Sequence, residues 1–226
     1  MPYSKYFQYL IRLAYYMINI LIADDHSIVR EGLKQIISGN ADMIVLDEAC
    51  SGNEAIEKLR KNAFSMAILD IAMPGKNGLD TMKEIKLEHP NLPVLILSMY
   101  PEEQYAVRFF RAGAAGYLTK KSAPEELVNA IRTISKGKKY VSPSLAETLI
   151  GELDVTTEKS LHSALSDREF QVLCLISSGK TSGEIADELC LSIKTVSTYR
   201  ARILEKLRLK NTAELINYAI QNQLVE

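Results

Sequence analysis

The chain has 226 residues, with 47% hydrophobic and 24% charged side chains, which is the composition of an ordinary globular protein and excludes a disordered one. Its 27 basic and 28 acidic residues give a net charge of −1, which excludes a general electrostatic attraction to nucleic acid. Any such binding therefore requires a local basic surface, and the length suits two domains.

The chain begins with an N-terminal extension, residues 1–17, in which only Lys5 and Arg12 are charged. The extension is too short and too interrupted to span a membrane, and it lacks a small-residue cleavage site. Met17 stands where the first domain would naturally begin, which favours a mis-assigned translation start or a dispensable tail. A helix that binds a membrane surface or a partner protein is the alternative interpretation.

Between residues 18 and 137, short apolar runs alternate with segments of helical periodicity. The five runs predict strands at Ile18–Ala23, Met43–Leu46, Met66–Leu69, Val94–Leu97 and Ala115–Leu118. Ser51 with Glu54 is expected to form a capping box for one helix, and Ser122 with Pro124 and Glu125 for another. This alternation predicts an α/β domain with a doubly wound, parallel, five-stranded sheet, whose ligand chemistry lies at the carboxyl ends of the strands.

Polar side chains follow four of these strands at the point where each strand ends. They are Asp24-Asp25 after the first strand, Asp70 after the third, Ser98 after the fourth and Thr119-Lys120 after the fifth. On one rim of a sheet, three carboxylates repel one another and need a counter-charge. Carboxylate oxygens completed by water and a backbone carbonyl suit Mg²⁺. With Lys120 as a cation and Ser98 as a hydroxyl, the rim has the groups that phosphoryl transfer needs.

The pattern changes after Gly137. Residues 138–160 contain a turn and a polar, acidic stretch, and are predicted to be a linker. Residues 161–226 carry only helical signals, beginning with a capping box of Ser166 and Glu169. A short helix near Glu184–Leu189 is joined by a tight turn to a helix at about Lys194–Leu207. This is the helix-turn-helix pattern, in a small all-α domain.

The second helix of this pattern is basic. Between residues 194 and 210 there are six cations and one anion, Glu205, a local net charge of +5. The cations are Lys194, Arg200, Arg202, Lys206, Arg208 and Lys210. Because so few acids compensate them, we expect this stretch to contact nucleic-acid phosphates rather than to be a solvated helix face.

Residues 18–137 resemble the receiver domain of bacterial two-component response regulators. The matching residues are Asp24-Asp25, Asp70 within Asp70-Ile71-Ala72-Met73-Pro74, Ser98, Tyr117 and Lys120. The resemblance implies the sheet order 2-1-3-4-5, and it implies that Asp70 accepts phosphate from a sensor histidine kinase. It further implies that Asp25 and Asp70 ligate Mg²⁺ with the Ala72 carbonyl, while Asp24 acts mainly through water. Ser98 and Tyr117 would be the switch pair, the Tyr117 ring turning from exposed to buried after phosphorylation.

The C-terminal residues are similar to LuxR-type DNA-binding domains. The matching segments are Leu165–Leu173, Gly179, Glu184-Ile185-Ala186, Leu191-Ser192, Thr195-Val196 and Lys206-Leu207. Together with the receiver, they indicate the NarL/FixJ branch of response regulators. Ser197 and Tyr199 stand where the family usually has Lys and His, so the resemblance does not indicate which DNA sequence is read.

Two groups of residues are candidate DNA contacts. On the basic helix, Lys194, Ser197, Thr198 and Arg202 are expected to face the groove, with Arg200 and Lys206 nearer the DNA backbone. Thr195 and Tyr199 of the same helix are also candidate DNA contacts. At the junction before the short helix, Lys180, Thr181 and Ser182 are candidate phosphate contacts. Apolar residues of the last helix, Leu215, Ile216, Ala219 and Ile220, would serve equally as a dimer face or as core.

The sequence therefore predicts a DNA-binding transcriptional regulator switched by phosphorylation of Asp70. Beyond Mg²⁺-dependent phosphoryl acceptance and autodephosphorylation, no enzyme activity is expected. The expected partners are a sensor histidine kinase, double-stranded promoter DNA and a second copy of the chain, without a membrane. Cys50, Cys174 and Cys190 lack metal-ligand spacing and are expected to be core residues in a reducing cytoplasm.

Two alternatives stay open. One is a DNA-binding regulator that works without phosphorylation, which the complete set of acidic residues and Lys120 disfavours. The other is an aspartyl-phosphate phosphohydrolase, an enzyme class that usually has a second Asp two residues after the nucleophile. Here Ala72 occupies that position.

Overall fold

The computed structural model describes residues 17–73, 76, 78–142, 145–146, 161–222 and 224–225. The chain divides into two compact units. One unit runs to Met99 and continues from Phe109 to Tyr140, and the other comprises Tyr100–Arg108 and the chain from Val141 onward. The predicted extension up to residue 16, most of the predicted linker and the Pro74-Gly75 turn lie outside the described residues. Among the described helices, none has the length and apolar character needed to cross a membrane.

The first unit contains the predicted parallel sheet, with the strand order β2-β1-β3-β4-β5. The strands are β1 (Ile18–Ala23), β2 (Met43–Ala49), β3 (Met66–Asp70), β4 (Val94–Ser98) and β5 (Gly116–Thr119). Every residue of β3 and β4 is buried, as expected for the inner strands of a sheet covered on both faces. The predicted strands, fold class and sheet order are confirmed. The main difference is that the edge strand β2 ends at Ala49, whereas the predicted strand ended at Leu46. The added part contains Asp47 and Glu48, and an apolar run does not include charged residues.

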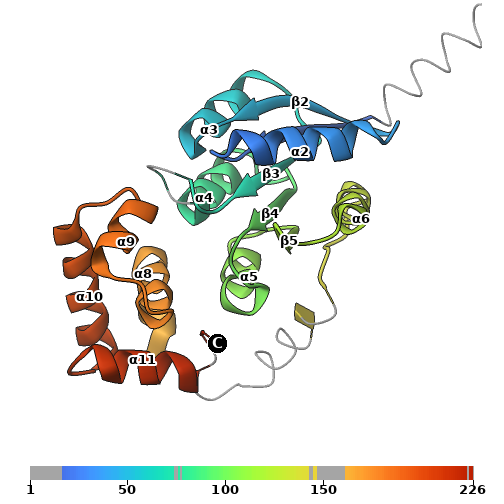
Figure 1. The fold of residues 1–226 in the computed structure, drawn as a ribbon. Helices are drawn as coiled ribbons and strands as arrows, with labels where there is room; N and C mark the ends of the chain where they lie inside the picture. The colour runs from blue at the N-terminus through green and yellow to red at the C-terminus, as the bar shows by residue number, and fades with distance from the viewer. Residues whose placement is uncertain are drawn as a thin grey trace, which may run out of the picture. The chain divides into compact units, whose positions relative to one another are not determined.

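Helices cover the sheet (Figure 1). They are α2 (Ser27–Ser38), α3 (Gly52–Lys61), α4 (Gly78–Glu88) and α6 (Pro124–Ser135). Most of α5 (Glu102–Arg111) belongs to the other unit. Leu33 and Ile37 of α2 and Ile131 of α6 share one hydrophobic cluster with Ile20 and Ile22 of β1. Helices α2 and α6 therefore lie on the same face of the sheet. Burial of this apolar cluster is the main interaction that stabilises the packing of the two helices on the sheet.

The predicted helix caps of this unit are partly correct. The Ser51 side chain accepts a hydrogen bond from the Glu54 amide (3.3 Å), but the Glu54 carboxylate accepts from the Cys50 amide, so the box is shifted by one residue. The prediction for Ser122 is wrong, because Ala123 is the N-cap residue of α6 and makes no side-chain capping bond. Proline at the first helical position already has the helical φ and needs no capped amide, which explains why the helix begins there.

The second unit is helical, as predicted. It contains the 3₁₀ helix η1 (Leu161–Ala164) and helices α8 (Asp167–Ser177), α9 (Ser182–Glu188), α10 (Ile193–Leu207) and α11 (Thr212–Gln221). The capping box is confirmed, with the Ser166 amide donating to Glu169 Oε2 at 2.7 Å. Val196, Ile203 and Leu207 form the buried face of α10. Cys174 is buried as expected, whereas Cys50 and Cys190 are exposed, so the prediction that all three cysteines are core residues is wrong.

Cys190 lies in the turn between α9 and α10 with a positive φ of 51°. This left-handed conformation costs a residue with a Cβ atom about 1 kcal/mol, and glycine adopts it without that cost. We expect Cys190→Gly to stabilise the second unit by about 0.5–1 kcal/mol in urea unfolding. Cys190→Ala, which keeps the Cβ, is the control, and equal stability of the two variants would contradict the prediction.

Candidate functional site

Acidic side chains meet at the carboxyl end of the sheet, as predicted. Asp24 directly follows β1, Asp70 is the last residue of β3, and both are only 1% exposed. Asp25 joins them with a side chain that is 30% exposed. One possible ligand atom from each of these three residues and from His26 lies within 4.8 Å of the others. The strands therefore bring together carboxylates that are far apart in the sequence.

Lys120 neutralises part of this charge. Its ammonium Nζ lies 2.6 Å from Asp24 Oδ2 and 2.8 Å from Asp70 Oδ2, and its side chain is 6% exposed. Residue 120 reaches this rim because Ser98 and Thr119 are partners in the β4–β5 register and the Lys120 amide donates to the Ser98 carbonyl. One buried cation thus serves two buried carboxylates.

The pKa values of Asp70 and Lys120 are both raised at this site, which disfavours the charged form of Asp70 and favours that of Lys120. Burial raises the pKa of the Asp70 carboxyl, and the negative charge of Asp24 raises it further, although Lys120 opposes both. Burial alone would lower the pKa of Lys120, but the attraction of Asp70 and Asp24 outweighs it, and the pKa is raised. Lys120 therefore stays protonated, while the Asp70 anion is held at a cost in free energy.

The two predicted switch residues lie on neighbouring strands. Ser98 is buried at the end of β4, directly beside the backbone of Lys120. Tyr117 is buried in β5, where its ring centroid is 6.1 Å from that of Phe109. In this structure the tyrosine ring therefore has the inward orientation. Its role as a switch stays a prediction.

The loop after β3 shapes the other side of the site. The Ala72 amide donates to Asp70 Oδ1 at 3.2 Å, and the Gly78 amide donates to the Ile71 carbonyl at 3.2 Å. A Cβ atom on Gly78 would overlap the Ile71 backbone, so α4 can begin here only with glycine. The close approach of α4 fixes the segment that carries Asp70 and Ala72.

The donor set fits a hard divalent cation. Receiver domains generally bind Mg²⁺ at an acidic pocket of this type, and carboxylate oxygens are its preferred protein ligands. Asp24 Oδ2 and Asp25 Oδ1 are buried atoms that accept no hydrogen bond from the described residues. Asp24 Oδ2 lies 2.6 Å from Lys120 Nζ, and Asp25 Oδ1 lies 2.9 Å from His26 Nδ1. Their unused lone pairs are suited to a metal ion.

The predicted DNA contacts of α10 lie on its outer side. Ser192 caps the helix by accepting from the Thr195 amide at 3.0 Å. The exposed predicted residues are Lys194, Ser197, Thr198, Arg200, Arg202 and Lys206, while Thr195 and Tyr199 are half-buried. The hydroxyls of Ser197 and Thr198 donate to the backbone carbonyls of Ile193 and Lys194. The helix therefore presents a polar, basic side opposite its buried face.

The other predicted contacts cluster at the start of α9. Thr181 is its N-cap residue and forms a capping box with Glu184, whose carboxylate accepts from the Thr181 amide at 2.8 Å. Ser182 is the first helical residue, and Lys180, which precedes the N-cap residue, forms an ion pair with Glu188. In the last helix Leu215 and Ala219 are core residues, while Ile220 is exposed, so only part of the predicted dimer face is available.

Lys206 has a structural contact that the sequence did not indicate. Its Nζ lies 2.6 Å from Glu169 Oε2, and the Glu169 side chain is almost fully buried. Burial disfavours the Glu169 anion, but hydrogen bonds from Lys206 and Ser166 outweigh it and lower the pKa of the carboxyl. Lys206 therefore helps to fold the unit, whatever else it contacts.

We expect Lys206→Ala to destabilise the second unit by about 1 kcal/mol, because a buried carboxylate loses its partly exposed counter-charge. Urea unfolding of the full chain measures this. Arg202→Ala is the matched control, since the described residues offer Arg202 no ion pair, and its stability should stay within about 0.5 kcal/mol of the wild type. A Lys206→Ala variant as stable as Arg202→Ala would contradict the prediction.

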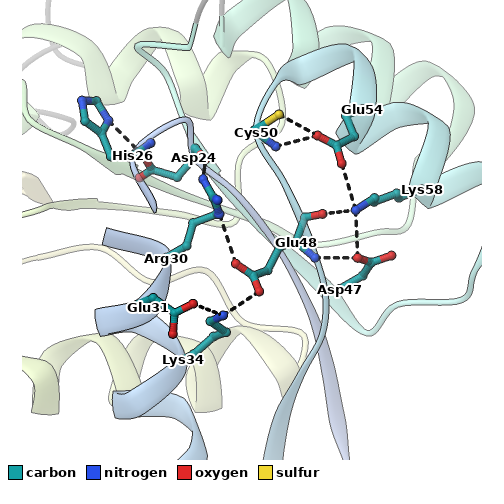
Figure 2. Close-up of polar contacts among 10 residues, drawn as sticks. All are labelled: Asp24, His26, Arg30, Glu31, Lys34, Asp47, Glu48, Cys50, Glu54 and Lys58. Carbon is teal, nitrogen blue, oxygen red and sulfur yellow. Dashed lines mark hydrogen bonds and ion pairs between the residues drawn. The ribbon is translucent and has the colours of Figure 1, made fainter. Parts of the chain in front are cut away.

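Sequence reasoning missed the polar network behind the acidic rim (Figure 2). Arg30 of α2 donates to the Asp24 carbonyl at 2.7 Å and to Glu48 of β2 at 3.1 Å. Glu48 also accepts from Lys34 at 2.7 Å. The helical spacing of Arg30 and Lys34 was visible in the sequence, but their common partner lies beyond the predicted end of β2.

Two family models match the chain. Residues 20–132 match the response regulator receiver domain, and residues 163–219 match the bacterial regulatory proteins of the luxR family. The first range contains the acidic rim and Lys120, and the second contains α8, α9 and α10.

Three relatives match this chain along most of its length and of their own. The oxygen regulatory protein NreC of Staphylococcus carnosus is 37% identical over 214 residues, which cover 92% of this chain and 99% of NreC. The response regulator UvrY of Escherichia coli strain K12 is 34% identical over 209 residues, covering 92% and 96%. The solved structure of RcsB from Salmonella enterica serovar Typhimurium, bound to promoter P1flhDC with the phosphomimetic BeF₃⁻, is 30% identical with a TM-score of 0.57, covering 89% and 97%.

Proposed function

The chain is a two-component response regulator of the NarL/FixJ branch, with a receiver domain and a LuxR-type DNA-binding domain, and on this premise we propose that phosphorylation of Asp70 controls its binding to DNA. The observation that carries the proposal is the buried contact of Lys120 with both Asp24 and Asp70 in the same chain as the basic α10. The proposed domains are residues 18–137 and 161–226, joined by a linker at 138–160.

Asp25, Asp70 and the Ala72 carbonyl would hold Mg²⁺, with Asp24 contributing mainly through water. When bound, the metal supplies positive charge that neutralises the incoming phosphoryl oxygens. The protein itself holds the carboxylates of Asp24 and Asp70 in position. Lys120 holds Asp24 and Asp70 at 2.6 and 2.8 Å, and the Ala72 amide orients the second oxygen of Asp70.

In the proposed step an Asp70 carboxylate oxygen forms a bond to the phosphorus of a phosphohistidine, while the bond between phosphorus and the histidine nitrogen breaks. Lys120 stays protonated and faces the developing negative charge. Ser98 would donate its hydroxyl to a phosphoryl oxygen, and Tyr117 would respond to the movement of the Ser98 loop. Attack of water on the acyl phosphate would later release inorganic phosphate, which is the autodephosphorylation of this proposal.

The proposed output is a change in promoter binding by α10. Lys194, Ser197, Thr198 and Arg202 lie on one exposed side of that helix and would face the groove, with phosphate contacts from Lys180, Thr181 and Ser182. The protein would bind as a homodimer, as a symmetric promoter site requires. The protein would act in the cytoplasm, where a kinase and DNA are both accessible.

Binding of the full chain to a genomic fragment library tests the proposal, with and without a small phosphodonor, for the wild type and Asp70→Ala. We expect the phosphodonor to change the affinity of the wild type only, and both proteins to lose affinity steeply as salt increases. If the phosphodonor changes neither protein, control by phosphorylation is wrong. Binding that does not depend on salt would be evidence against the basic helix as the DNA contact.

A further inference from the structure

We propose that Arg30 is a positioning residue for the magnesium site, because it holds the backbone that carries Asp24 and Asp25. The inference rests on the proposed function, since the metal site is that of the phosphoryl acceptor. Arg30 lies one turn into α2, and its side chain is 19% exposed. Figure 2 shows its guanidinium between the Asp24 loop and Glu48 of β2.

The Asp24 carbonyl needs such a donor. The Asp24 amide still donates to the Ala49 carbonyl of β2 at 3.1 Å, although Asp24 itself lies past the end of β1. Its carbonyl accepts from Arg30 Nη1 at 2.7 Å. A backbone carbonyl needs a donor, and here an arginine takes the place that a neighbouring strand would have. Both polar groups of Asp24 are thereby fixed, and Asp25 follows directly across the next peptide bond.

The second contact of Arg30 depends on an irregularity in β2. Ile20 pairs with Val45, but Leu21 pairs with Asp47, so Leu46 is one extra residue in the edge strand. As a result Ile22 pairs with Glu48. Ile22 belongs to the hydrophobic cluster that contains Leu33 and Ile37 of α2, so the Glu48 side chain emerges toward α2.

Glu48 is itself held from both sides. Lys34 donates to its carboxylate at 2.7 Å, and this hydrogen bond, with that from Arg30, lowers the pKa of Glu48. On the side of α3, Lys58 donates to the Glu48 backbone carbonyl and, at 2.9 Å, to Asp47 (Figure 2). An ionised, anchored carboxylate therefore restrains Arg30, and Arg30 restrains the acidic loop.

An electrostatic role and a positioning role of Arg30 predict opposite changes in Mg²⁺ affinity when the residue is replaced. A guanidinium close to a cation site repels the metal, so removal of its charge alone would strengthen Mg²⁺ binding. Loss of a residue that orients metal ligands weakens binding, typically by 10–100-fold. The direction of the change therefore separates a positioning role from an electrostatic one.

The experiment measures the Mg²⁺ dissociation constant of the unphosphorylated full chain by calorimetry, together with its urea unfolding. We expect Arg30→Met to raise the dissociation constant about tenfold. Arg30→Lys keeps the charge but cannot span both acceptors, and it should weaken binding at least about threefold. The matched control is Arg132→Met, because Arg132 makes a comparable forked contact with Asp42 (2.8 and 2.9 Å) away from the acidic rim, and its Mg²⁺ affinity should equal that of the wild type.

A positioning role also predicts that the phosphorylation rate of Arg30→Met approaches the wild-type rate at saturating Mg²⁺, which a general loss of folding would not allow. An unchanged or lowered dissociation constant for Arg30→Met overturns the inference, as does an Arg30→Lys variant that binds like the wild type. If the wild type itself binds no Mg²⁺, the metal site of the proposed function is wrong as well. These results distinguish failure of the inference from failure of the function on which it rests.

Discussion

Asp70→Asn is expected to abolish phosphoryl acceptance and at the same time to stabilise the metal-free protein by roughly 1–2 kcal/mol. The amide is not a nucleophile for phosphorus, so incorporation of phosphate from a small phosphodonor should fall below detection. The gain in stability arises because burial and the Asp24 charge disfavour the Asp70 anion. Phosphate incorporation and urea unfolding of the same preparations test the two effects.

The pH dependence of this stability difference has a definite sign. A carboxyl whose pKa is raised by folding destabilises the native state above that raised pKa, and the penalty fades as the pH falls toward the ordinary value of 3.8. The advantage of Asp70→Asn should therefore be complete near neutral pH and vanish toward pH 4. Mg²⁺ should also reduce the stability difference between Asp70→Asn and the wild type, because the metal stabilises the ionised Asp70 of the wild type. An Asp70→Asn variant less stable than the wild type at neutral pH would contradict this account.

Gly78→Ala is expected to destabilise the first unit by about 2–3 kcal/mol and to impair phosphorylation. A Cβ atom at this position would overlap Cα of Ile71 and lie 2.8 Å from its Cβ. Either α4 or the segment after Asp70 must shift, and the Asp70 segment carries the Ala72 carbonyl of the proposed metal site. Urea unfolding and the Mg²⁺ dependence of phosphorylation measure the two losses.

Gly32→Ala is the matched control for this substitution. Gly32 lies in α2, and a Cβ atom there would meet no atom within 4 Å. Alanine is the better helix former, so this variant should gain up to about 1 kcal/mol. If Gly78→Ala were as stable as Gly32→Ala, the prediction that a Cβ atom at position 78 displaces α4 or the segment after Asp70 would be wrong.

The fold and the acidic rim could be predicted because both depend on local patterns. The strands of a parallel sheet end at one edge, so apolar runs ending in Asp24, Asp70, Ser98 and Lys120 were enough to predict that these residues meet. The sheet order came from the resemblance to receivers, because alternation of strands and helices does not specify it. The capping box of Ser166 was equally local and was predicted correctly.

Most of the features that escaped prediction depend on tertiary contacts. The continuation of β2 through Asp47 and Glu48 is stabilised by cations of α2 and α3, which the periodicity of β2 does not reveal. The pairing of Lys206 with Glu169 joins residues of two helices that are 37 positions apart in the sequence. The positive φ of Cys190 occurs without the glycine that normally signals it. The first two features depend on a second element, whereas the φ of Cys190 is a local property that the residue type does not signal.

The extra residue in β2 constrains how this protein can vary. If β2 paired regularly, with Leu46 opposite Leu21, Ile22 would pair with Asp47, and the acidic side chains would exchange faces of the sheet. Arg30 would then meet an aspartate too short to replace Glu48, and Lys58 would face Glu48 in place of Asp47. Leu46 itself is exposed and has no partner on β1, so its substitution or deletion would leave Leu21 opposite Asp47 and Ile22 opposite Glu48. In related sequences we therefore expect the acidic residues opposite Leu21 and Ile22 to be kept, even where the residue before them differs or is missing.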